Sequence, residues 1–268
     1  MLVLEDGFVD IDTPTGPMRT YVYRPKPAVE GVPEKHPGVV LYSEIFQQTK
    51  PVARTAIMLA GHGFVVYVPE VYHELLPIGT VLTYTPEDSA KGNACKIEKE
   101  LSSYDGDFQA AVAHLTASPH CTGAVGVAGM CLGGGLAFRA AIVCPSVKGA
   151  VCWYPTDLHK GGLSKTGDDS LKRCAEAKGC RFLMLFGTSD PHIPREGRRQ
   201  IDDAMANAEL KYEWHEFAGA HAFLRDENSF GRACVCVIMP SSSCRYFLPS
   251  SSCTRPFNIL LTLNTTPI

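Results

Sequence analysis

The sequence has no cluster of lysine or arginine, no long apolar segment and no basic leader, and each absence excludes a class of function. Its 25 lysines and arginines stand against 28 acidic residues, for a net charge of −3, so no basic patch is available for nucleic acid or an anionic membrane. No apolar stretch approaches the roughly 18 residues of a transmembrane helix. Glu5 and Asp6 interrupt the N-terminus where a secretory signal needs a longer apolar run. We therefore expect a cytoplasmic protein that binds neither nucleic acid nor membrane.

Cysteine is abundant, at 11 of 268 residues, but the spacings that bind metal ions are missing. The chain has no pair of CxxC motifs and no HExxH motif, so we expect no zinc site. In the cytosol the cysteines should stay reduced and pack as small apolar side chains. We expect neither a metal nor an organic cofactor.

Compact apolar segments alternate with helical patterns along most of the chain. Short apolar runs bounded by turn formers predict strands at residues 7–12, 19–25, 36–44, 63–70, 122–129, 147–155, 181–190 and 210–221. Helical spacing of apolar residues predicts helices at residues 51–63, 104–119, 134–143 and 195–208. This alternation predicts an α/β fold, with a mostly parallel central sheet and helices on both faces. The first two strands should form an antiparallel edge pair, and residues 70–103 should form a loop excursion or lid.

The composition changes abruptly near residue 230. Residues 231–268 contain no Asp, Glu, Lys or His, carry two Ser triplets and show no helical period where the alternation requires a closing helix. We expect a domain over residues 1–230 and an atypical low-complexity tail over residues 231–268, with the closing C-terminal helix missing or replaced. Because the composition breaks at one point, we favour a translated intron or frameshift as the origin of the tail, with a low-complexity extension as the alternative.

The segment GVAGMCLGGG, residues 126–135, places one cysteine among five glycines between a predicted strand and a predicted helix. Gly129-Met130-Cys131-Leu132-Gly133 is the G-x-C-x-G form of the nucleophile elbow. Side chains two positions before and after the nucleophile would clash in that strained turn, which makes glycine a steric requirement. The start of the next helix would also favour a thiolate. The alternative is a glycine-rich turn that carries an inert, buried thiol.

An elbow predicts an acid and then a histidine, each after a later strand. Asp190 lies at the end of the predicted strand at 181–190, and His221 lies at the end of the next one, at 210–221. Taken alone, Asp190 could be a turn or helix-cap residue and His221 a surface histidine. His192 competes with His221, although its own strand already supplies the acid.

Four spaced motifs resemble the dienelactone hydrolase (carboxymethylenebutenolidase) family of α/β-hydrolases: LYSEIFQ, GVAGMCLGGGLAFRAA, GTSDPHIP and AGAHAFLRDE. The resemblance covers roughly residues 8–230 and implies an α/β-hydrolase fold. It also implies a catalytic triad of Cys131, His221 and Asp190.

The resemblance implies further site residues. Glu44, in SEIF, corresponds to a glutamate that meets the resting thiol, with a solvent-facing carboxylate as the alternative. The backbone N–H groups of Ile45 and Leu132 correspond to an oxyanion hole. Arg225, four residues after His221, corresponds to an arginine that binds the substrate carboxylate, with an exposed loop arginine as the alternative.

The sequence departs from the family pattern at one position. Aligning VPEVYHE places Glu74 where the bacterial enzymes have a second carboxylate-binding arginine, and a carboxylate there would repel an anionic substrate. Tyr72 and Tyr84 are candidate substrate-binding residues, with core or lid packing as the alternative for each. The exact lactone therefore stays open.

We expect a hydrolase that opens a small lactone or ester through an acyl-enzyme on Cys131, acting as a monomer or weak homodimer. Two other classes stay open. One is a non-catalytic or misspliced family member that acts as a binding protein. The other is a redox sensor that uses the same thiol without turnover.

Overall fold

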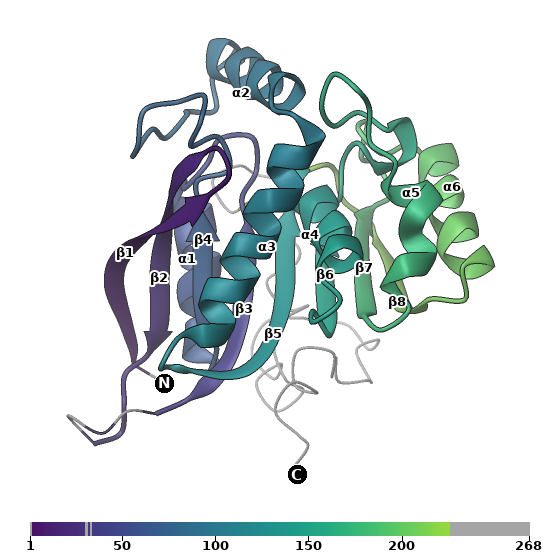
Figure 1. The fold of residues 1–268 in the computed structure, drawn as a ribbon. Coiled ribbons are helices and arrows are strands. Elements are labelled where there is room, and N and C mark those ends of the chain that lie inside the picture. The colour runs from purple at the N-terminus through teal and green to yellow at the C-terminus, as the bar shows by residue number, and fades with distance from the viewer. Residues whose placement is uncertain (1, 30–31, 33, 226–268) are drawn as a thin grey trace.

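The computed structural model describes residues 2–29, 32 and 34–225 (Figure 1). Its strands occur at or close to the positions that the sequence predicts. They are β1 (Val3–Thr13), β2 (Gly16–Pro25), β3 (His36–Tyr42), β4 (Val65–Pro69), β5 (Cys121–Met130), β6 (Gly149–Trp153), β7 (Arg181–Gly187) and β8 (Lys211–Phe217).

These strands form one sheet in the order β1-β2-β4-β3-β5-β6-β7-β8. β1 pairs with β2, and β2 with β4, in antiparallel register, while every pair from β4 to β8 is parallel. The expected antiparallel edge pair and mostly parallel sheet are both confirmed. The carboxyl ends of parallel strands meet at one edge of a sheet, where ligands usually bind in open α/β folds.

The helices lie on both faces of this sheet, as expected. They are α1 (Lys50–Gly61), α2 (Pro86–Glu98), α3 (Leu101–Ala117), α4 (Leu132–Val143), α5 (Ser170–Arg173) and α6 (Arg195–Asn207), with short 3₁₀ turns η1 (Leu158–Lys160) and η2 (Cys174–Ala177). α3 and α4 lie side by side across β3 and β5, whereas α1 lies behind β2 and β4 (Figure 1). The central strands are buried from both sides; β4, for example, has five buried residues in a row.

Residues 70–103 are more regular than the sequence suggests. The expected loop excursion contains α2, a helix of 13 residues, and the first residues of α3. Thr85 caps α2 by accepting a hydrogen bond from the Asp88 N–H, and Pro86 occupies the first turn. Both residues are standard start signals of a helix. The prediction missed them because the segment has little apolar periodicity.

The sequence-based expectations for the tail and the closing helix fall on residues 231–268, outside the described residues. Within the described part of the chain, the seven cysteines are all buried and none forms a disulfide. No helix there is both long and apolar enough to span a bilayer.

Candidate active site

Cys131 lies at the turn between β5 and α4, in a conformation that L-residues rarely adopt. Its φ is 58° and its ψ is −121°, and the side chain is only 9% exposed. The Cys131 N–H donates to the Trp153 carbonyl at 3.0 Å, and its carbonyl accepts from the N–H groups of Gly134 and Thr156. These bonds hold the strained backbone in place, so the Cα–Cβ bond of Cys131 has a fixed direction.

The two flanking glycines are sterically required, as the elbow pattern predicts. A Cβ on Gly129 would lie 2.0 Å from the Gly133 carbonyl oxygen, and a Cβ on Gly133 would lie 2.1 Å from the Tyr42 carbonyl oxygen. Both clashes are with backbone atoms, which cannot rotate away. The sequence GMCLG therefore reflects close packing of β5, α4 and β3.

Asp190 and His221 follow β7 and β8 and meet beside Cys131. Asp190 is 3% exposed, and its Oδ2 accepts a hydrogen bond of 2.7 Å from His221 Nδ1. The other carboxylate oxygen of Asp190 accepts from the His192 N–H at 2.8 Å. Asp190 is thus fixed from two sides and orients the imidazole ring of His221.

The protonation of His221 depends on its two partners. Burial alone would lower the pKa of His221, but the charge of Cys131 and the hydrogen bond to Asp190 raise it to about 10. Burial tends to raise the pKa of Asp190, and the hydrogen bond and charge of His221 more than reverse this, so the pKa is lowered. The neighbouring Cys131 and Asp190 therefore favour the protonated form of the His221 imidazole.

His192, the competing histidine, packs edge-on against His221, with ring centres 4.5 Å apart. Burial and the positive charge of His221 lower the pKa of His192. Its backbone N–H, rather than its ring, contacts Asp190. In this structure His221 is therefore the partner of the carboxylate, and His192 is its neighbour.

Glu44 is not solvent-facing. It is 1% exposed, and its Oε1 accepts a hydrogen bond of 2.7 Å from Arg225 Nη2. The Arg225 guanidinium stacks on the Tyr84 ring at 3.9 Å, and the Tyr84 hydroxyl donates to Thr49 Oγ1 at 3.0 Å. Arg225 is therefore held between a carboxylate and an aromatic ring.

The two residues expected to supply the oxyanion hole lie near Cys131 in different ways: Leu132 follows it in the sequence, and Ile45 lines the same cavity. Leu132 is the first residue of α4, so its N–H has no acceptor within the helix. Ile45 lines the same cavity as Cys131. It follows β3, which pairs with β5 in parallel register.

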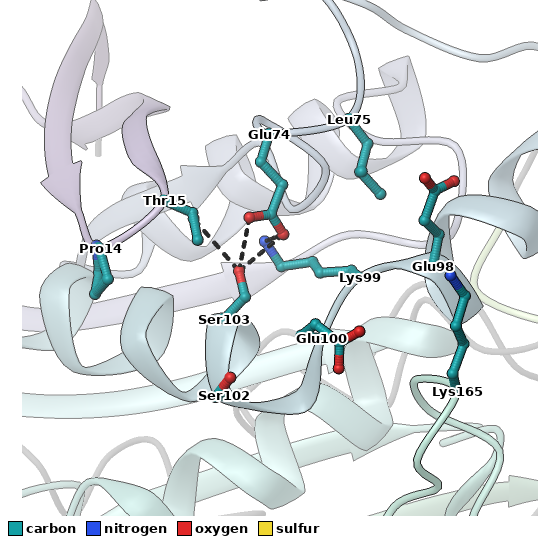
Figure 2. A pocket seen from close by; sticks show the side chains of 10 residues that line it. All are labelled: Pro14, Thr15, Glu74, Leu75, Glu98, Lys99, Glu100, Ser102, Ser103 and Lys165. Atoms are coloured by element: carbon teal, nitrogen blue, oxygen red, sulfur yellow. Dashed lines mark hydrogen bonds and ion pairs between the residues drawn. The ribbon is translucent and has the colours of Figure 1, made fainter.

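Tyr72 and Glu74 occupy positions that the sequence does not reveal. Tyr72 is fully buried, and its hydroxyl donates to the Gly92 carbonyl at 3.0 Å, so it packs beneath α2. Glu74 pairs with Lys99 at 2.8 Å and accepts from the Ser103 hydroxyl (Figure 2). These contacts belong to a separate cavity of about 570 Å³, so the expectation that Glu74 repels a substrate at the thiol needs correction.

The cavity at Cys131 has a volume of about 250 Å³, enough for a small molecule. Its lining residues come from the ends of the strands, from η1 and from one face of α2. They are Ile45, Phe46, Ser89, Asn93, Lys96, Cys131, Thr156, Asp157, Lys160, His192, His221 and Arg225. Among the described residues, no group of three or more His, Cys, Asp or Glu side chains is arranged to hold a metal ion.

The sequence analysis missed the polar residues that α2 and η1 contribute to this cavity. Ser89, Asn93 and Lys96 recur at helical spacing, and Lys96 pairs with Asp157 at 2.9 Å. The start signals at Thr85 and Pro86 could have revealed the helix, and hence this shared face.

Comparisons with known proteins agree with this geometry. The sequence profile described as "Dienelactone hydrolase family" matches residues 18–239. A Saccharomyces cerevisiae protein, provisionally named carboxymethylenebutenolidase, is 39% identical over 86% of this chain and 86% of its own length. Pseudomonas putida carboxymethylenebutenolidase is 32% identical over 75% of this chain and 82% of its own length.

A solved structure from Klebsiella pneumoniae, provisionally described as a dienelactone hydrolase, has the same fold. Its TM-score is 0.73 at 21% identity, over 86% of this chain and 92% of that chain. The fold is therefore that of the α/β-hydrolases, as the sequence predicts.

Proposed function

The chain belongs to the dienelactone hydrolase family and is a hydrolase of the lactone or ester type, and from this premise we propose that it acts through Cys131, His221 and Asp190. The observation that carries the proposal is the convergence of three strand ends on one cavity. A strained cysteine at the end of β5 faces a histidine that a buried aspartate orients at 2.7 Å. This is the arrangement that an activated nucleophile requires.

The proposed reaction has two halves. The Cys131 thiolate adds to the substrate carbonyl carbon, and the N–H groups of Ile45 and Leu132 stabilise the oxyanion. Collapse breaks the carbon–oxygen bond of the ring or ester and leaves a thioester on Cys131. The departing oxygen takes a proton from the His221 imidazolium. His221 then removes a proton from water, which attacks the thioester and releases the thiolate and the acid product.

Glu44 and Arg225 would prepare the site for an anionic substrate. In the free protein the two side chains neutralise each other at 2.7 Å. A substrate carboxylate would compete for Arg225, as the family resemblance implies, and Glu44 would then be released toward the thiol. Tyr84 stacks on the guanidinium and would keep it in place during this exchange. Lys160 adds positive charge to the same cavity, whereas the charge of Lys96 is paired with Asp157.

The decisive experiment compares hydrolysis of a dienelactone and of a small activated ester by the purified protein and by Cys131→Ala. We expect the variant to lose about a thousandfold or more in kcat, because it lacks the nucleophile. Hydrolysis that persists in Cys131→Ala would contradict the proposal. Absence of turnover together with peroxide-sensitive modification of Cys131 would favour a redox sensor instead.

A further inference from the structure

Helix α2 approaches the backbone of Ile45 more closely than any side chain would permit. A Cβ on Gly92, which is buried, would lie 2.5 Å from the Ile45 carbonyl oxygen and 3.0 Å from the Ile45 Cβ. Contacts below about 3 Å are essentially absent for real Cβ atoms, so glycine alone permits this approach. The helix thus rests directly on the residue whose N–H is the candidate oxyanion donor.

Tyr72 fixes α2 and the loop at residues 43–49 to each other. Its hydroxyl donates to the Gly92 carbonyl at 3.0 Å, and its N–H donates to Gln47 Oε1 at 3.2 Å. Because Tyr72 is fully buried, water cannot replace these bonds.

The loop at 43–49 is itself tightly constrained. Gln47 has a φ of 65° and is 1% exposed, and its N–H donates to the Glu44 carbonyl at 3.3 Å. The Leu82 N–H donates to the Phe46 carbonyl at 3.1 Å. Ile45 therefore lies in a loop that is held on both sides of it, with α2 pressed against its carbonyl.

We propose that Gly92 and Tyr72 are positioning residues that set the place of the Ile45 N–H in the oxyanion hole. The inference rests on the proposed role of that N–H. A donor stabilises an oxyanion only at hydrogen-bond distance, and displacement by a few tenths of an ångström weakens it in the transition state. Ground-state binding depends on other groups, such as Arg225, and is affected less.

The test uses Gly92→Ala and Tyr72→Phe. We expect Gly92→Ala to lower kcat by about tenfold to a hundredfold while KM changes by less than about threefold, because removal of one donor costs about 10²–10³. Tyr72→Phe should change kcat in the same direction by a smaller factor. The matched control is Gly106→Ala in α3, where the new Cβ meets the Pro14 ring at 3.1 Å and neither residue lines the cavity at Cys131. Its kcat should be unchanged.

Two probes separate positioning from general damage. The Ki of trifluoroacetone, which forms a tetrahedral adduct with the thiolate, should rise in parallel with the loss of kcat. Alkylation of Cys131 by iodoacetamide creates no oxyanion, so its rate should be retained.

An unchanged kcat and Ki in folded Gly92→Ala would overturn the inference while leaving the triad proposal intact. An alkylation rate that falls with kcat would also overturn it, since the nucleophile itself would then be disturbed. If Gly92→Ala does not fold, Tyr72→Phe decides by the same criteria. Full activity in Cys131→Ala would instead remove the proposed function and this inference together.

Discussion

Two buried carboxylates in the candidate site differ by their partners. Asp190 contacts a histidine at 2.7 Å, whereas Glu44 contacts an arginine at the same distance. Arginine stays charged at every relevant pH, but histidine can gain and lose its proton. Asp190 is therefore suited to orient His221 as a proton carrier. Glu44 is suited to release Arg225 when a substrate carboxylate binds that arginine.

At the residue scale, His221 should remain protonated well above neutral pH. Its pKa is raised from 6.5 to about 10, chiefly by Cys131 and Asp190 acting against burial. Because the folded pKa is raised, the charge stabilises the fold fully below about pH 6.5, and this contribution is lost as pH rises through about 10.

NMR titration of the imidazole, assigned with His221→Asn, measures this pKa directly. In Cys131→Ala the pKa of His221 should fall, because the contribution of Cys131 that raises it is lost. A wild-type His221 that titrates near 6.5 would contradict this prediction.

At the scale of elements, the elbow depends on the contact of α4 with β3. Gly133→Ala would place a Cβ 2.1 Å from the Tyr42 carbonyl oxygen and 2.5 Å from its carbonyl carbon. Relief requires α4 or β3 to move, so we expect a loss of activity of about a hundredfold or more, because the nucleophile is misplaced.

Gly179→Ala is the matched control for this prediction, since a Cβ there meets nothing within 4 Å. Its rate of ester and dienelactone hydrolysis should match that of the wild type. An active, folded Gly133→Ala would show that the turn tolerates rearrangement.

The elements also show which site residues a sequence can reveal. The convergence of Cys131, Asp190 and His221 was predictable because each follows a strand with an apolar pattern, and the ends of parallel strands converge. The pair of Glu44 and Arg225 joins residues that lie far apart in the sequence, so only folding brings them together. The roles of Tyr72 and Glu74 depend on the path of residues 70–103. That path is set by α2, a helix with little apolar periodicity.

At the scale of the whole molecule, a buried ion network connects distant segments. Lys99, with a side chain that is 0% exposed, pairs with Glu74 and Asp107 at 2.8 Å each. His73 contacts Asp107 at 3.1 Å. The Ser103 hydroxyl lies 3.3 Å from the Thr15 hydroxyl in the hairpin between β1 and β2 (Figure 2). The network joins the end of α2 to α3 and to the edge hairpin.

Replacement of Lys99, the cation at the centre of this network, should therefore destabilise the fold. Lys99→Met leaves two carboxylates without their buried partner, and we expect the free energy of unfolding to fall by about 3 kcal/mol. Urea unfolding measures the change, with the exposed Lys172→Met as the matched control. A loss below about 1 kcal/mol would mean that the network is solvated like a surface pair.

The central claim is that Cys131 becomes acylated during turnover, and mass spectrometry of rapidly quenched enzyme tests it most directly. The protein is mixed with a small activated ester, quenched in acid within the first turnover and digested for peptide mapping. The account predicts an acyl adduct on the peptide that contains Cys131, formed and lost at rates compatible with kcat and absent in Cys131→Ala. Turnover without any adduct on Cys131, or an adduct on another residue that forms at the rate of turnover, would contradict it.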